Sequence, residues 1–86
     1  MPRALTIQRT IVPSSERPRY LARARQRSEY YAKAGCRFWI FEEAALPGAF
    51  IEFTEAKDRN TLSAAHAAAP EKLVDAKRIY TEVELS

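Results

Sequence analysis

Residues 36–55 read CRFWIFEEAALPGAFIEFTE and indicate two strands joined by a turn. The first run, 36–43, is apolar on both faces, with Cys36, Phe38 and Ile40 on one and Trp39 and Phe41 on the other. A Leu-Pro-Gly turn signal occupies 46–48. The second run, 49–55, has Ile51 and Phe53 on one side and Phe50 on the other. The short separation predicts an antiparallel hairpin with aromatic side chains on both faces.

The residues before this hairpin predict one strand and one helix. Residues 4–12 alternate, and we expect their apolar side to face the core and their polar side to face solvent. The apolar side holds Leu5, Ile7 and Ile11, and the polar side holds Thr6, Gln8 and Thr10. A serine after Pro13 is expected to cap a helix that ends near Ala34, because Gly35 suits the left-handed residue that ends helices. The predicted buried stripe of this helix is Leu21, Ala24, Ser28, Tyr31 and Ala32.

The residues after the hairpin predict a second helix and a last strand. Asp58 is a good N-cap, and Pro70 should stop the helix that follows it. The positions expected to be buried in this helix are Leu62, Ala65, His66 and Ala69. Residues 78–85 alternate again and predict a strand. Its inward residues are expected to be Ile79, Val83 and Leu85, and its outward ones Tyr80, Glu82 and Glu84.

The element order is therefore β-α-β-β-α-β within 86 residues. This length fits a single α+β domain over residues 1–86. We expect a ferredoxin-like fold, in which a four-stranded antiparallel sheet carries both helices on one face. Right-handed crossovers would place the first and third strands in the centre of the sheet.

Composition narrows the possible classes of protein. A single cysteine, Cys36, excludes an intramolecular disulfide, and a single histidine, His66, excludes a Cys/His zinc cluster. The sequence has no metal-ligand spacing and no phosphate-binding glycine loop, so we expect no metal and no cofactor. No apolar run approaches the ~20 residues that span a bilayer, and residues 1–3 lead into a strand rather than a signal peptide. We therefore expect no membrane contact, and the unpaired cysteine favours a cytoplasmic location.

The uncovered face of such a sheet is the main functional signal in the sequence. Two helices can cover only one face, yet the central hairpin has aromatic residues on both. An exposed patch of this kind usually marks an interaction site. We therefore expect the sheet to meet a second copy of the chain, a ligand or a nucleic acid base, and a homodimer through the sheet face is the favoured alternative.

Two segments carry a resemblance to a known family. Residues 52–56, EFTEA, lead to LSAAH at 62–66 and then to Pro70, and Gly35-Cys36-x-Phe38 opens the second strand. These features resemble the dimeric α/β-barrel proteins of the antibiotic-biosynthesis-monooxygenase type. The resemblance implies a homodimeric barrel and a cofactor-independent monooxygenase acting on a partly apolar organic molecule. A tryptophan common in the family shortly after the strand-three glutamate is absent, since Phe53 and Thr54 stand there.

Several side chains are candidates for a site in the cleft between helices and sheet. His66 is a candidate general base, because its ordinary pKa lies near neutrality, although it also suits a structural or interface role. Arg25 and Arg9 could hold a carboxylate or enolate-like anion there; alternatively they reach the rim or pair with Glu42, Glu52 or Glu55. Aromatic residues could line a pocket for the ligand or form the core or interface, and the candidates are Tyr31, Trp39, Phe41 and Tyr80.

Two other classes of function remain open. One is a non-catalytic oligomeric or regulatory module. The other is a single-stranded RNA binder, because GAFIEF at 48–53 partly matches a strand whose aromatic residues stack on bases. Residues 16–33 hold six basic and two acidic residues, which gives this segment the excess positive charge. A run of this kind is more typical of a solvated helix face, so nucleic acid is disfavoured as a partner.

Overall fold

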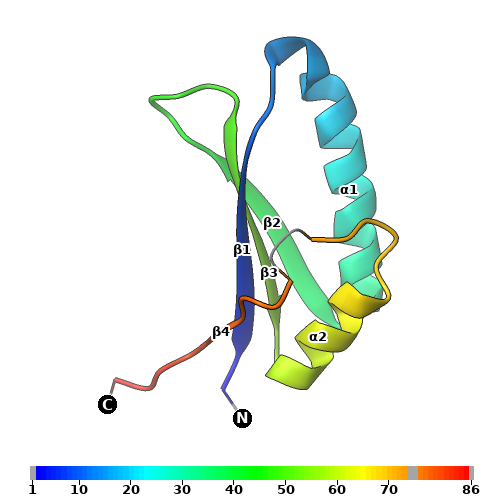
Figure 1. Ribbon diagram of the computed structural model, residues 1–86, viewed down its shortest axis with the longest axis vertical. Coiled ribbons are helices and arrows are strands. Elements are labelled where there is room, and N and C mark those ends of the chain that lie inside the picture. The colour runs from blue at the N-terminus through cyan, green and yellow to red at the C-terminus, as the bar shows by residue number, and fades with distance from the viewer. Residues whose placement is uncertain (1, 74–75, 86) are drawn as a thin grey trace.

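The chain folds as an α+β structure, described by a computed structural model for residues 2–73 and 76–85. Its elements are β1 (Ala4–Ile11), the short 3-10 helix η1 (Ser14–Glu16), α1 (Arg17–Lys33), β2 (Cys36–Glu42), β3 (Ala49–Ala56), α2 (Arg59–Ala67) and β4 (Tyr80–Thr81). The strands form one antiparallel sheet in the order β2-β3-β1-β4, and both helices lie on the same face of it (Figure 1). The predicted α+β class is confirmed, with β1 and β3 in the centre, and the arrangement is compatible with a ferredoxin-like fold.

The hairpin between β2 and β3 depends on Gly48. This residue has a φ of +96°, and a Cβ placed on it would lie 2.7 Å from the carbonyl oxygen of Val12. The backbone N–H of Val12 donates to the Gly48 carbonyl at 2.8 Å, which ties the turn to the end of β1. A side chain at this position would therefore both strain the backbone and push these two segments apart.

The two helices agree with the prediction at three of their four ends. Gly35 follows α1 with a φ of +81°, and the Asp58 carboxylate accepts from the Thr61 backbone N–H at 2.7 Å at the start of α2. Pro70 lies beyond α2, as expected. The predicted serine cap of α1 is wrong, because Ser14–Glu16 form η1 and Glu16 is an N-cap without a side-chain hydrogen bond.

The buried stripe of α1 is also shifted by one residue at its start. Tyr20, Ala24 and Tyr31 are the buried residues of this helix. The predicted stripe members Leu21 and Ser28 are only half-buried, and Ala32 is exposed. The tyrosines can face inward because their hydroxyl groups find polar partners there, as described below.

The polarity predicted for β1 is inverted in the structure. Register pairs Thr6 with Thr54 and Gln8 with Glu52, and Thr6, Thr54 and Glu52 are all buried on the face that the helices cover. Leu5, Ile7 and Ile11, which were expected to face the core, lie on the uncovered face instead, and Ile11 is 65% exposed. The expectation failed because His66 of α2 supplies a buried hydrogen-bond partner for Thr6, within a core that is largely apolar.

The last strand is much shorter than predicted. Only Tyr80–Thr81 pair with β1, opposite Leu5 and Ala4. The segment after them departs from the sheet on the side away from the helices (Figure 1). Ile79 packs against the core, but the inward placement predicted for Val83 and Leu85 is wrong, since both side chains are exposed.

Candidate functional site

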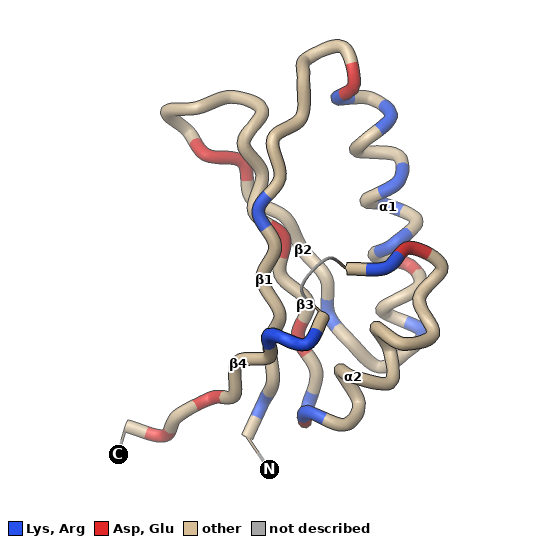
Figure 2. The backbone as a smooth tube through the Cα atoms, in the orientation of Figure 1, with Lys and Arg blue, Asp and Glu red and all other residues tan. Residues whose placement is uncertain are grey.

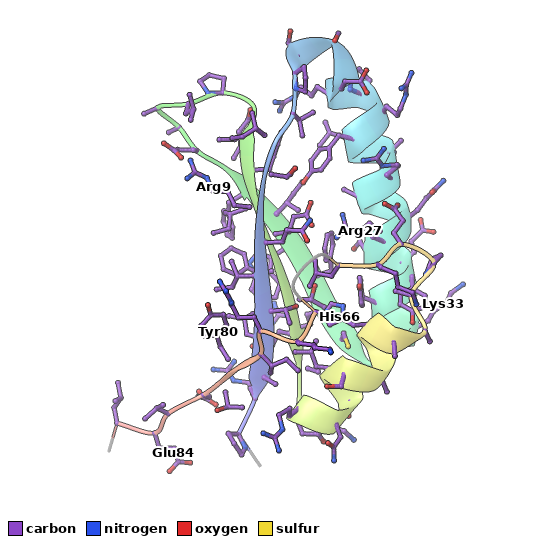
Figure 3. The ribbon with its side chains drawn as sticks, in the orientation of Figure 1. Arg9, Arg27, Lys33, His66, Tyr80 and Glu84 are labelled. Carbon is purple, nitrogen blue, oxygen red and sulfur yellow. The ribbon has the colours of Figure 1, made fainter. Side chains whose placement is uncertain are left out.

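A layer of buried polar side chains lies between the sheet and the helices. Its four most enclosed members are Thr6, Glu52, Thr54 and His66. Among residues 2–73 and 76–85, every buried side-chain nitrogen or oxygen has a hydrogen-bond partner. Figure 3 shows Arg27 and His66 on this side of the sheet, with Arg9 and Tyr80 on the opposite side. The interior of this small domain is thus organised around satisfied polar groups.

The first part of this layer is a buried ion pair with a tyrosine. The Arg27 Nη2 lies 2.7 Å from Glu52 Oε1, and the Tyr20 hydroxyl donates to Glu52 Oε2 at 2.7 Å. Arg27 also stacks its guanidinium over the Phe38 ring, 4.9 Å from the centroid. Burial alone would lower the pKa of Arg27, but the hydrogen bond and charge of Glu52 raise it overall. Burial and then the Glu52 carboxylate raise the pKa of Tyr20, so this hydroxyl stays protonated.

The second part is centred on His66, which lies between two hydroxyl groups. The Thr6 Oγ1 is 2.8 Å from His66 Nε2, and the Tyr31 hydroxyl is 2.9 Å from His66 Nδ1. Burial, followed by the charge of Arg27, lowers the pKa of His66. The ring is therefore neutral at pH 7, with one nitrogen that donates and one that accepts. Which hydroxyl donates to it depends on the tautomer.

Two clefts approach this layer from the surface. The first, about 240 Å³, lies between α1 and β1 and is lined by polar groups that include Thr10, Tyr20, Arg27 and Glu52. The second, about 450 Å³, lies beside α2 and reaches His66. Its walls are mainly apolar and include Ala67, Leu73, Ala76 and Ile79. Lys72 lines both clefts, so the α1 cleft and the α2 cleft flank the same segment of chain.

The structure places the predicted site residues in two separate regions. His66 and Tyr31 are buried together in the polar layer. Arg25 is exposed and borders a surface hollow beside β2 with Trp39. Arg9 lies on the uncovered face and pairs with Glu43 at 2.9 Å. Arg9 therefore lies outside the helix–sheet cleft in a rim ion pair, whereas Arg25 borders an open hollow between α1 and β2, so the structure does not bring the two arginines into one site.

The basic residue that enters the interior is Arg27, which the sequence reasoning missed together with Tyr20 and Glu52. A signal was available, since Tyr20, Ala24, Arg27 and Tyr31 are spaced by four, three and four residues. This spacing places them on one helical face. Glu52 shares its face of β3 with Phe50 and Thr54, and its sequence context indicated only a possible ion-pair partner for Arg9 or Arg25.

The uncovered face of the sheet carries Trp39 and Phe41, as predicted. We define the open face by Leu5, Ile7, Ile11, Trp39, Phe41, Ile51, Phe53 and Tyr80. The rings of Trp39 and Phe53 stack with centroids 5.6 Å apart, and Phe41 meets Phe53 edge-on at 5.8 Å. The side chain of Phe41 remains 57% exposed. The open face is therefore largely apolar, with packed aromatic rings on β2 and β3 and with Arg9 between Ile7 and Ile11 on β1.

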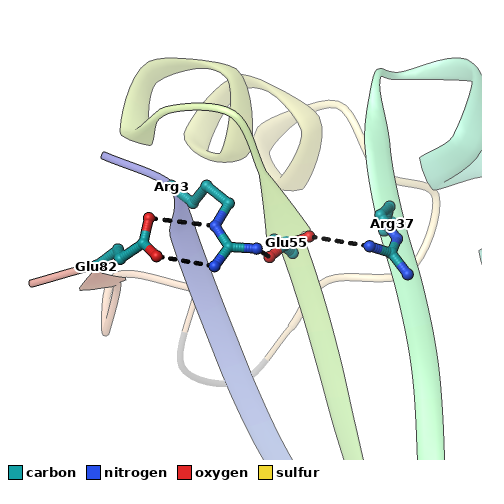
Figure 4. A network of polar contacts seen from close by, with 4 residues as sticks. All are labelled: Arg3, Arg37, Glu55 and Glu82. Atoms are coloured by element: carbon teal, nitrogen blue, oxygen red, sulfur yellow. Dashed lines mark hydrogen bonds and ion pairs between the residues drawn. The ribbon is translucent and has the colours of Figure 1, made fainter. Parts of the chain in front are cut away.

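Charged residues at the ends of the open face pair with one another. At one end Arg3 bridges Glu82 and Glu55, at 2.8 Å and 3.1 Å, and Arg37 lies 3.8 Å from the same Glu55 (Figure 4). The Arg9–Glu43 pair lies toward the other end. These groups balance in charge, so the open face carries no strong field of either sign.

The basic character of α1 is also largely compensated. Figure 2 shows basic positions along this helix. Four of its five arginines contact a glutamate carboxylate, the pairs being Arg17–Glu42, Arg19–Glu16, Arg23–Glu71 and Arg27–Glu52. This helix therefore does not present a row of free guanidinium groups to an anionic polymer.

Comparison with known proteins adds no assignment. No family model, curated protein or solved structure matches this chain.

In the part of the chain that the structure describes, no helix has the length and apolar character needed to cross a bilayer. The same residues contain no group of three or more His, Cys, Asp or Glu side chains able to hold a metal ion. The buried thiol of Cys36 has its pKa raised by burial, so it is a poor nucleophile at neutral pH.

Proposed function

We propose that this protein is a homodimer that binds a small, partly apolar organic molecule at the polar layer beneath its helices. One observation carries the proposal, namely the inverted polarity of β1 and the charged groups buried next to it. Thr6, Glu52 and His66 are buried beneath the helices within a largely apolar core, whereas Leu5, Ile7 and Ile11 lie on the face that the helices leave open. Burial of Glu52, Arg27 and His66 is costly for a domain of this size, so a function in that layer is the expected compensation.

The homodimer is supported by the shape and charge of the open face. The helices do not cover the aromatic and branched side chains there, and full burial of the exposed ones, such as Ile11 and Phe41, contributes about 2 kcal/mol each. Charges at both ends of the face are already paired, so two copies can approach without like-charge repulsion. A second copy of the chain supplies an apolar surface of matching chemistry, as an isologous interface requires.

Ligand binding is supported by the two clefts. The α2 cleft offers apolar walls that end on the neutral imidazole of His66, while the α1 cleft offers the hydroxyl of Thr10 and the Tyr20–Glu52–Arg27 group. A molecule with an aromatic ring and a hydroxyl or carbonyl group matches walls of this kind. If the protein is an enzyme of the oxygenase type that its sequence resembles, His66 would accept a proton from such a substrate through the Thr6 or Tyr31 hydroxyl, because these two groups contact its two ring nitrogens.

The ligand proposal is tested by titrating 2-naphthol into the protein and following backbone amide resonances. We expect the largest shifts near His66, Ala67 and Ile79. Ala67→Trp would fill the α2 cleft and abolish them, whereas Ala68→Trp, at an exposed position outside the lining, would leave them intact. Shifts confined to the open face, or equal effects of the two variants, would contradict the assignment of this cleft.

The aromatic open face also favours a second candidate, a single-stranded nucleic acid binder. Against it, β1 contributes Leu5, Ile7 and Arg9 to that face and no aromatic ring. A fluorescent oligonucleotide that binds at low salt, with affinity that falls steeply as salt is raised, would support this candidate. If the protein is a dimer that binds neither an oligonucleotide nor a small molecule, the remaining class of function is a non-catalytic oligomeric module.

A further inference from the structure

The segment 82–85, which we call the arm, presents apolar side chains to solvent. Val83 is 73% exposed and Leu85 is 93% exposed. Both values exceed the 65% of Ile11, the most exposed apolar residue of the open face. Two acidic residues, Glu82 and Glu84, alternate with them. The arm runs outward from the sheet on the side opposite the helices (Figure 1). These two side chains add to the apolar surface of the neighbouring open face, and large apolar surfaces of this kind mark interaction sites.

The root of the arm is fixed at one end of the open face. The Glu82 N–H donates to the Arg3 carbonyl at 2.8 Å, and the Arg3 guanidinium holds the Glu82 carboxylate through two nitrogens at 3.2 and 2.8 Å (Figure 4). Arg3 is held in turn by Glu55 of β3. This bidentate contact orients the start of the arm, so its outward course is set by the fold.

A hollow of about 290 Å³ lies beside this root on the open face. Its apolar lining comes from Leu5, Trp39, Phe53 and Tyr80. A two-fold axis that pairs the same ends of two sheets would bring each hollow next to the arm of the other subunit. The space suits a valine or leucine side chain, and the arm offers both.

The size of the open face gives a second reason for an arm. Three strands of about eight residues cover a plane of roughly 400 Å², whereas a standard interface takes about 800 Å² from each partner. Packing of the arm on the partner would enlarge the buried surface and cover Val83 and Leu85 together.

We propose that the arm of each subunit packs on the open face of the second copy, with Val83 and Leu85 at the hollow beside Trp39. This inference rests on the proposed homodimer. It makes the dimer depend on residues that contribute nothing to the core of their own subunit. The polar residues Glu82 and Glu84 would remain at the rim of the interface.

The test compares Val83→Ser, Leu85→Ser and the control Glu84→Gln by sedimentation and by iodide quenching of Trp39, the only tryptophan. We expect each apolar variant to raise the dimer dissociation constant about tenfold or more. At concentrations where the dimer still forms, quenching of Trp39 should rise in the same two variants. Glu84→Gln should change neither quantity, and circular dichroism should show an unchanged fold in all three.

The outcomes separate the two proposals. A dimeric wild type whose dissociation constant or Trp39 quenching is unchanged in both apolar variants would overturn the arm and leave the homodimer standing. A monomeric wild type at high concentration would overturn the homodimer and the arm together.

Discussion

Glu52 and Phe53 are neighbours on β3 but belong to opposite environments. Glu52 is 3% exposed and accepts hydrogen bonds from Tyr20 and Arg27 beneath the helices. Phe53 stacks on Trp39 on the open face. At this point of the sheet a charged side chain is buried and an aromatic one lies on the uncovered face, which is the reverse of the usual placement of these residue types.

The interior ion pair should be important for stability. Glu52→Gln keeps the size of the side chain but leaves the Arg27 guanidinium buried without a counter-charge. We expect the free energy of unfolding in urea to fall by about 3 kcal/mol. The matched control is Glu16→Gln, which breaks an exposed pair with Arg19 and should cost less than about 1 kcal/mol. Equal losses in the two variants would show that the Glu52 pair is not buried in solution.

His66 should make stability depend on pH between about 7.5 and 5.5. Its pKa is lower in the folded chain than the usual 6.5, so the unfolded chain binds more protons in this range. The free energy of unfolding should therefore fall as the pH drops below about 6.5, by up to ~1.4 kcal/mol per pH unit. Urea unfolding at several pH values measures this slope.

The control for this dependence is His66→Gln, which removes the only imidazole in the chain. The variant will be less stable at pH 7.5, because the contacts to Thr6 and Tyr31 change. Its slope between pH 7.5 and 5.5 should nevertheless be smaller than that of the wild type. A variant with the wild-type slope would assign the dependence to other groups.

The two glycines should differ in their tolerance of alanine. Both have positive φ values, so Gly35→Ala and Gly48→Ala each strain the backbone by about 1 kcal/mol. At Gly35 the added Cβ meets only a Thr61 methyl carbon at 3.9 Å, whereas at Gly48 it collides with the Val12 carbonyl. Thermal unfolding should show the larger loss for Gly48→Ala. A larger loss for Gly35→Ala would contradict the geometry of the turn.

The hairpin could be predicted in detail because its pattern is local. Alternation alone assigns Phe38 and Ile40 to one face and Trp39 to the other, and the structure agrees. The turn at Gly48 and the cap at Asp58 follow from residue chemistry that acts over a few positions. These features need no knowledge of distant contacts.

The facing of β1 could not be predicted by the same reasoning. Alternation shows that Leu5 and Thr6 face opposite ways, but the choice of the covered side depends on what α1 and α2 bring. His66, which is itself held by the Tyr31 hydroxyl, supplies a hydrogen-bond partner for Thr6, and this makes the polar side the better one to bury. The apolar side of β1 then lies on the face that the helices do not cover, and alternation within the strand alone cannot anticipate this choice.

An arginine on the open face should separate subunits without unfolding them. Phe41→Arg replaces an exposed ring of the proposed interface with a second guanidinium in the hollow that Arg9 also lines, and should raise the dimer dissociation constant by at least tenfold. Leu46→Arg is the control, because Leu46 is similarly exposed but lies in the hairpin turn rather than on the open face. If both variants have the same effect on sedimentation, the interface lies elsewhere.

The most direct measurement is the molar mass of the wild-type chain in solution, obtained by sedimentation equilibrium at micromolar concentration. A second copy seated on the open face predicts a mass of about twice the 9.8 kDa of one chain, with Trp39 shielded from iodide. A species of 9.8 kDa whose Trp39 is freely quenched would contradict it, because the apolar side of the sheet would then stand in water.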